Sequence, residues 1–205
     1  MYSRSTGGPP VRNATQTRGA VLEAARRALR ERGVQVSLGT IAKAAGVSKG
    51  GLLHHFRTKD ELFLALVQDV YKTFEVEVRR YLETEREGPG KLARSYVRAI
   101  CMEFRESNQL LQYAASLHAL YTVEPAVEYA HHEIGKWRAA LDNDSINPHV
   151  VALIFYAIDG IAGGFFYGAM HSSEDIDALE TRMIRMIDRD REFAELLEDS
   201  RAMPP

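Results

Sequence analysis

The sequence contains very little cysteine and begins without an apolar segment. Its single cysteine, Cys101, excludes an intramolecular disulfide framework and leaves no CxxC motif for metal or redox chemistry. The first ten residues, MYSRSTGGPP, contain no apolar run of the kind found in secretory signal peptides. We therefore expect a reduced, cytoplasmic setting for this protein.

The sequence also lacks the common local motifs of enzymes. It contains no GxSxG, no glycine-rich phosphate-binding loop and no HExxH. The run His131-His132-Glu133 does not replace them, because adjacent histidines on a helix point about 100° apart and do not easily bind one ion. We expect no enzymatic activity, no cofactor and no bound metal.

Charge is unevenly distributed along the 205 residues, whose 45% hydrophobic and 26% charged content is ordinary for a soluble globular protein. Residues 1–60 contain 11 lysines and arginines against 3 acidic residues, whereas residues 61–205 contain 15 against 25. A basic first third is typical of a nucleic-acid-binding domain. The acidic remainder argues against general adhesion to DNA or to an anionic membrane.

Two short helices are predicted around a glycine turn, after a first helix over residues 17–32. Ser37 can cap one of the two, and Gly46 can adopt the left-handed backbone that ends it. Ser48 can cap the other, because its hydroxyl accepts a hydrogen bond from a free amide of the first turn. Such a pair is the form of a helix-turn-helix, although spacing alone fits a structural αα corner equally well.

The run IAKAAGVSKGGLLHHFRTKDEL resembles the signature of the TetR family of transcriptional regulators. The resemblance implies an all-α homodimer with an N-terminal three-helix DNA-binding domain that contains the helix-turn-helix. It also implies a C-terminal helical bundle for ligand binding and dimerisation. On this basis we divide the chain into a flexible arm (1–14), a DNA-binding domain (15–75) and a ligand-binding and dimerisation domain (76–205).

The resemblance also indicates which residues contact DNA. Lys59 matches a phosphate-contacting lysine of the family, and Thr40 matches a backbone or base contact. Gly51 stands where threonine is frequent and Leu53 where a phosphate-contacting tyrosine is usual, which affects sequence reading more than affinity. The predicted DNA-binding residues are Thr40, Ser48, Lys49, Gly50, Gly51, His54, His55 and Lys59.

Helical periodicity continues through the rest of the chain. A capping-box pattern at Thr58 begins a helix that should reach about Thr84, and Gly88-Pro89-Gly90 breaks the chain after it. Apolar residues that step by three and four predict a core-facing seam from Val127 to Leu141, which includes Ile134.

The segment from Val150 to Met170 is apolar all round, so we expect it to be buried on every side. Its length could span a bilayer, but Asp159 at its centre would cost roughly 3 kcal/mol and no Lys/Arg cluster flanks it. We therefore reject a membrane span. A carboxylate in an apolar helix needs a polar partner, and a ligand contact and a dimer-interface hydrogen bond are equal alternatives for Asp159.

A helical bundle can enclose an apolar cavity with a few polar groups, and an aromatic lining would favour a lipophilic or aromatic effector. Core packing is the alternative for each aromatic ring, and a satisfied core histidine is the alternative for His118. The predicted ligand-binding residues are Phe104, His118, Tyr121, Trp137, Phe155 and Asp159.

Glycines spaced four apart in the same segment form a shallow stripe that a second helix can approach closely. In the TetR family the last two main helices pair with their copies as a four-helix dimer interface. The predicted dimer-interface residues are Gly160, Gly164, Gly168, Ile176, Leu179, Met183 and Ile187.

These features together predict a homodimeric, ligand-responsive DNA-binding transcriptional regulator. It would act as a repressor that a small effector releases from a palindromic operator on double-stranded DNA. The alternatives are a helical ligand-binding module without an operator and, less favoured, a small all-α enzyme. The sequence identifies neither the effector nor the operator.

Overall fold

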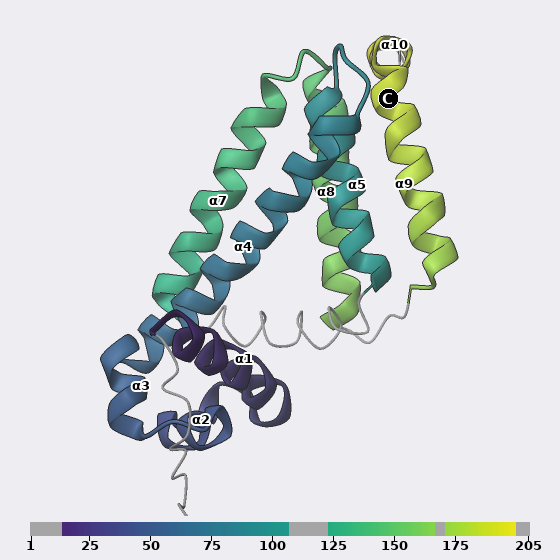
Figure 1. The fold of residues 1–205 in the computed structure, drawn as a ribbon. Helices are drawn as coiled ribbons and strands as arrows, with labels where there is room; N and C mark the ends of the chain where they lie inside the picture. The colour runs from purple at the N-terminus through teal and green to yellow at the C-terminus, as the bar shows by residue number, and fades with distance from the viewer. Residues whose placement is uncertain (1–13, 107–122, 167–170, 200–205) are drawn as a thin grey trace, which may run out of the picture. The chain divides into compact units, whose positions relative to one another are not determined.

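The computed structural model describes residues 14–106, 123–166 and 171–199, and every regular element in these ranges is a helix (Figure 1). The prediction of an all-α fold is confirmed. The chain divides into two compact units, Met1–Leu62 and Phe63–Pro205. In chain order the helices are α1 (Ala14–Arg32), η1 (Gly33–Gln35), α2 (Leu38–Ala45), α3 (Lys49–His55), α4 (Lys59–Thr84), α5 (Lys91–Glu106), α7 (Glu124–Asp142), α8 (Pro148–Phe166), α9 (Ser173–Asp188) and α10 (Asp190–Asp199).

The first unit contains the predicted pair of short helices, α2 and α3. The hydroxyl oxygen of Ser37 accepts a hydrogen bond from the amide of Thr40 at 3.1 Å, and that of Ser48 accepts one from the amide of Gly51 at 3.0 Å. Gly46 ends α2 with a φ of 69°, a left-handed conformation that glycine adopts without a Cβ clash. Both N-caps and the glycine stop are therefore confirmed.

Apolar side chains of α1, α2 and α3 hold the first unit together, with α1 packed against α2 and α2 against α3. The buried side chains recur at three- and four-residue steps, as the amphipathic pattern predicts. They include Val21, Ala25, Ala28, Leu29, Ile41, Ala42, Leu52 and Phe56.

Helix α4 begins one residue after its predicted cap and ends at Thr84, as expected. The hydroxyl of Thr58 accepts a hydrogen bond from the amide of Glu61 at 3.0 Å. The carboxylate of Glu61 accepts one in return at 2.7 Å, from the amide of Arg57 rather than from that of the capping residue. The predicted domain boundary at residue 75 lies inside this helix, whereas the two compact units meet earlier in it.

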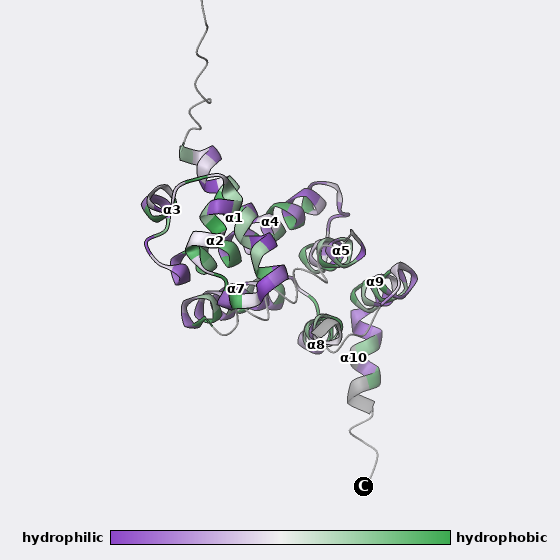
Figure 2. Ribbon diagram, turned by 90° about the horizontal axis from the view of Figure 1, so that it is seen from below, coloured by the Kyte–Doolittle hydropathy of each residue, from purple (hydrophilic) through white to green (hydrophobic). Residues whose placement is uncertain are grey.

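The second unit is built around a continuous apolar core. Helix α5 packs against α9 and α8, and α7 and α10 pack against α8. Figure 2 shows α5, α8 and α9 nearly end-on, with hydrophobic and hydrophilic residues on different sides of α5 and α9. The core includes Phe74, Val78, Tyr96, Val97, Cys101, Leu141, Val150, Ile154, Phe155, Ile158, Ile176, Met183 and Ile187.

Helix α8 is not buried on every side, so that prediction is wrong for the single chain. Val150, Ile154 and Ile158 face the core, but Leu153 is exposed and Tyr156 is 69% exposed. Hydropathy does not reveal whether a second apolar face is covered within the chain or by another molecule. Within the described ranges, no helix combines the length and hydrophobicity needed to cross a membrane.

The burial of side chains on α9 differs from part of the predicted dimer interface. Ile176, Met183 and Ile187 are at most 2% exposed and belong to the core of their own chain. Leu179 is partly buried against the same core. Ile176, Met183 and Ile187 are buried inside their own chain, where α9 packs against α5, so their side chains are not available to a second copy.

Helix α7 also differs in detail from the predicted seam. Pro125 occupies the first turn, where a proline loses no helical hydrogen bond. Ile134, however, is 41% exposed, and Glu133 is buried in its place. The ammonium of Lys136 lies 2.9 Å from the Glu133 carboxylate, which supplies a counter-charge for this buried acid.

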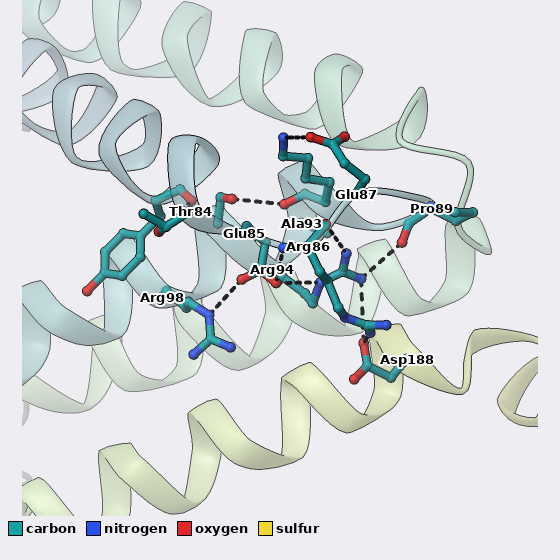
Figure 3. Close-up of polar contacts among 12 residues, drawn as sticks. Thr84, Glu85, Arg86, Glu87, Pro89, Ala93, Arg94, Arg98 and Asp188 are labelled. Atoms are coloured by element: carbon teal, nitrogen blue, oxygen red, sulfur yellow. Dashed lines mark hydrogen bonds and ion pairs between the residues drawn. The ribbon is translucent and has the colours of Figure 1, made fainter.

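The predicted break after α4 is a tight turn closed by a buried arginine (Figure 3). Gly88 and Gly90 have φ values of 113° and 77°, which favour glycine. The side chain of Arg94 in α5 donates to the carboxylate of Glu85 at 3.1 Å and to the carbonyl of Pro89 at 2.9 Å. One side chain thus connects the end of α4, the turn and α5.

Candidate functional site

The candidate DNA-binding surface consists of α2, α3 and the first turn of α4. None of the predicted DNA-contacting residues is buried in the structure. Ser48, Lys49, Gly50 and His54 are exposed, and Thr40, Gly51, His55 and Lys59 are partly exposed. Lys49 forms no ion pair with any residue that the structure describes, so its charge is available to a polyanion.

Thr40 is held by the same serine that caps α2. The Ser37 and Thr40 hydroxyl oxygens lie 2.9 Å apart, a hydrogen-bonding distance. This contact fixes the threonine hydroxyl at the start of the helix, and the sequence pattern did not indicate it. A positioned hydroxyl suits the phosphate or base contact that the family resemblance implies for Thr40.

The two glycines of α3 differ in their surroundings. A Cβ at Gly50 would approach nothing closer than the Ser48 hydroxyl at 4.0 Å, so the backbone there is open to close approach. A Cβ at Gly51 would lie 3.2 Å from that hydroxyl and would crowd the cap. The glycine that departs from the family pattern therefore also relieves crowding at the N-cap.

Phe56 and Leu52 anchor the inner side of α3. Both are buried, and the guanidinium of Arg18 in α1 lies 5.3 Å from the centroid of the Phe56 ring. A cation over an aromatic face at this distance is attractive. Sequence reasoning did not identify the contact with Arg18, because the two residues lie far apart in the chain.

Replacing Ser37 with alanine should destabilise the first unit by about 1 kcal/mol, because α2 loses its capping hydrogen bond and Thr40 loses its hydroxyl partner. The loss of stability is measured by urea unfolding, which is monitored through the circular dichroism signal of the helices. Ser5→Ala, which changes a serine outside the described residues, is the control. An unchanged midpoint in Ser37→Ala would contradict the capping assignment.

The candidate ligand-binding residues are only partly brought together. Phe104 and Phe155 are buried and Trp137 is partly buried, whereas Asp159 is exposed on α8. His118 and Tyr121 lie outside the described residues. Each ring that the structure describes belongs to or packs against the core of the second unit.

Tyr96 lies at the centre of the aromatic cluster, although sequence reasoning had not selected it. Its ring centroid lies 5.2 Å from that of Phe74, 5.4 Å from that of Trp137 and 5.8 Å from that of Phe155. The four rings come from α4, α5, α7 and α8, so no local spacing could have identified them as a group. Such edge-on and tilted pairs are favourable beyond their area of burial.

The glycine stripe of α8 lies on its open side. A Cβ at Gly160 or Gly163 would meet no atom within 4 Å, so neither glycine is required by packing inside the chain. Gly160 is exposed and Gly164 is partly exposed, while Gly168 lies outside the described residues. The exposed Tyr156 is on the same helix.

The geometry defines a helix-turn-helix unit followed by a separate helical unit. The chain matches "Bacterial regulatory proteins, tetR family" over residues 21–66 and "Tetracyclin repressor-like, C-terminal domain" over residues 90–188. The chain belongs to the TetR family.

Two relatives illustrate the match in sequence. The HTH-type transcriptional regulator TtgR of Pseudomonas putida is 40% identical over 75 residues, which is 36% of this chain and 35% of TtgR. The HTH-type transcriptional repressor AcnR of Corynebacterium efficiens is 38% identical over 68 residues, which is 33% of this chain and 34% of AcnR. Each match thus spans about a third of the relative's length.

The fold is also shared over most of the chain. The crystal structure of a transcriptional regulator from Rhodococcus sp. Rha1 aligns with a TM-score of 0.66, covering 86% of this chain and 96% of that one. The two sequences are 22% identical in this alignment, so the similarity shows the fold.

Proposed function

We propose that this protein is a homodimeric transcriptional regulator that binds a palindromic DNA operator and releases it when a small effector binds. The observation that carries the proposal is the α2–α3 pair, with its glycine turn and the exposed Lys49 and His54 on α3. We infer a cytoplasmic protein and a repressor, and we retain the domain limits 1–14, 15–75 and 76–205.

We infer that the exposed apolar face of α8 pairs with the same face of a second copy. Leu153 and Tyr156 leave hydrophobic surface on this face, and the open Gly160 permits a close approach between backbones. The same stretch of surface on two subunits is what a two-fold dimer needs. Two related DNA-binding units would then read half-sites one helical turn or more apart.

Helix α4 is the element through which we expect the effector to act. It begins next to α3, and its later residues Phe74 and Val78 belong to the core of the second unit. A ligand that binds this core more tightly in one position of α4 shifts the protein toward that position. The coupling lowers operator affinity if the favoured position changes the spacing of the two α3 helices.

The test is selection of random duplex DNA by the purified full chain at about 150 mM salt. We expect an enriched palindrome, and we expect Lys49→Ala to reduce the slope of log affinity against log salt by about 0.9 for each lost phosphate contact. Lys72→Ala removes an exposed lysine of the second unit and should leave the slope unchanged. A folded dimer that enriches no sequence, with or without refolding to remove ligand, would contradict the proposal.

Leu53 favours one alternative function. It is partly exposed on α3 where the family commonly has a phosphate-contacting tyrosine. A helical ligand-binding module that binds no operator would tolerate the replacement of this tyrosine by leucine. A folded protein that shows no salt-dependent affinity for any duplex DNA would support the module.

A further inference from the structure

Arg18 places an uncompensated positive charge on the surface of the first unit. The residue is exposed near the start of α1, and its guanidinium forms no ion pair with any residue that the structure describes. Arg26, further along the same helix, differs because its guanidinium lies 3.2 Å from the carboxylate of Glu23. The N–H groups of Arg18 therefore remain available to an anion from outside the chain.

The ring of Phe56 limits where this guanidinium lies. Phe56 ends α3 and is buried, and the guanidinium of Arg18 lies 5.3 Å from its centroid. An arginine can contact an aromatic ring and still donate hydrogen bonds to a phosphate. Because the ring already restricts the side chain, binding an anion costs less conformational entropy than it would for a free arginine.

The residues that follow the ring add further charge beside Arg18. Arg57 is exposed and its guanidinium has no ion pair among the described residues, and Lys59 is the first residue of α4. Asp60 and Glu61 lie in the first turn of α4, where the Glu61 carboxylate accepts a hydrogen bond from the amide of Arg57 at 2.7 Å. The three cations outnumber the two carboxylates, so the local charge favours an anion.

Positive charge is present at both ends of α3. The exposed Lys49 begins the helix, whereas Arg18 and Arg57 lie at its end, beside Phe56. A helix rises 1.5 Å per residue, so the two ends are roughly 10 Å apart. This spacing suits a polyanion with phosphates on either side of a groove better than one small anion, and the major groove of DNA is about 12 Å wide.

We propose that the guanidinium of Arg18 binds a phosphate of the DNA backbone, so that the DNA interface extends from the helix-turn-helix onto α1. The phosphate accepts hydrogen bonds from the guanidinium, which keeps its contact with the Phe56 ring. Arg57 and Lys59 supply positive charge to the neighbouring phosphates. The inference rests on the DNA-binding function proposed above and adds a contact that α2 and α3 do not provide.

The test measures the affinity of the purified full chain for two duplexes of equal length, the enriched sequence and an unrelated one, between about 50 and 200 mM salt. We expect Arg18→Gln to weaken both complexes about tenfold at the lowest salt. The slope of log affinity against log salt should fall by about 0.9, the value for one lost phosphate contact. An unchanged slope would overturn the proposal, and so would a loss confined to the enriched sequence, because phosphate contacts weaken all sequences alike.

Arg27→Gln is the matched control. Arg27 is also exposed on α1 and has no ion pair among the described residues, but it lies about two and a half turns beyond Arg18, on the opposite side of the helix. Its substitution removes the same charge and should leave the slope unchanged. An equal reduction in both variants would indicate a general effect of net charge and would contradict a contact at Arg18.

A purely structural role of Arg18 is tested separately, because Arg18→Gln also removes the contact with Phe56. Urea unfolding measures any lost stability, and a partly unfolded preparation lowers the apparent affinity by a similar factor at every salt concentration without changing the slope. Arg18→Lys keeps the charge but not the planar fork of donors. It should retain the slope of the parent and bind less weakly than Arg18→Gln.

Failure of this inference differs from failure of the proposed function. If no sequence is enriched but Arg18→Gln still reduces the salt slope for an unrelated duplex, the Arg18 contact stands and the reading of an operator is contradicted. If an operator is enriched and the slope of Arg18→Gln equals that of the parent, the Arg18 contact alone is wrong. A folded protein that binds no duplex at any salt concentration would contradict both.

Discussion

Replacing Arg94 with methionine should lower the free energy of unfolding of the second unit by about 3–5 kcal/mol. The guanidinium is 1% exposed and donates to the carboxylate of Glu85 and to the carbonyls of Pro89 and Arg86, at 2.9–3.1 Å (Figure 3). It also lies 3.5 Å from the carboxylate of Asp188 in α9. Methionine fills similar volume but leaves a buried acid and two carbonyls short of a donor.

The measurement is urea unfolding followed by the fluorescence of Trp137, with Arg79→Met as the control. Arg79 also forms an ion pair, with Glu75, but both side chains are at least half exposed, so its loss should cost less than about 0.5 kcal/mol. Equal effects of the two substitutions would show that burial does not strengthen the Arg94 contacts.

The effect of Arg94→Met should also depend on pH. Burial acts to raise the pKa of Glu85, but hydrogen bonds from Arg98 and Arg94 outweigh it and lower the pKa below its ordinary 4.5. A lowered carboxyl pKa stabilises the folded state above 4.5, and this stabilisation is lost as pH falls through the folded value. The difference between variant and parent should therefore shrink in acid, and a difference that grows there would contradict this account.

Gly90→Ala should destabilise the second unit by about 2–5 kcal/mol, the second largest effect that we expect. The φ of 77° costs an alanine about 1–2 kcal/mol, and overpacking adds about 1–3 kcal/mol. A Cβ there would collide with Ile187 and would lie 3.1 Å from both Ile146 and the Arg94 guanidinium. The amide of Gly90 also donates to the carbonyl of Asp144 at 3.0 Å, which limits movement of the turn.

Gly88→Ala is the matched control in the same turn. Its φ of 113° also favours glycine, but a Cβ there would meet no atom within 4 Å. It should therefore carry the backbone strain without the overpacking. The same urea titration compares the two variants, and a larger loss in Gly88→Ala than in Gly90→Ala would contradict the assigned packing.

Local signals along the chain were sufficient for the caps and stops of the helices. Ser37, Gly46, Ser48 and Thr58 act as predicted because a cap or a left-handed stop depends on a few neighbouring backbone groups. The family resemblance was likewise carried by one continuous run of residues. The all-α class and the helix-turn-helix could therefore be predicted from the sequence.

Predictions failed where a helix has more than one apolar face to offer. The α9 seam at Ile176, Met183 and Ile187 fits either a dimer interface or the contact with α5, and packing in the chain selects the second. On α7 the core accepts Glu133 and leaves Ile134 exposed, because Lys136 supplies the counter-charge. Apolar periodicity identifies which faces of a helix are hydrophobic, but it does not show which other helix or molecule covers each face.

The sequence by itself determined the DNA-binding motif with its caps and glycine stop, the end of α4 and the family, because each depends on residues close together in the chain. It did not determine the start of α1, which was predicted at residue 17 and lies at Ala14. Only the tertiary structure grouped Tyr96 with Phe74, Trp137 and Phe155, and placed Arg94 among Glu85, Asp188 and the turn carbonyls. These groupings join side chains from separate helices. Their contacts arise from packing, which local spacing does not encode.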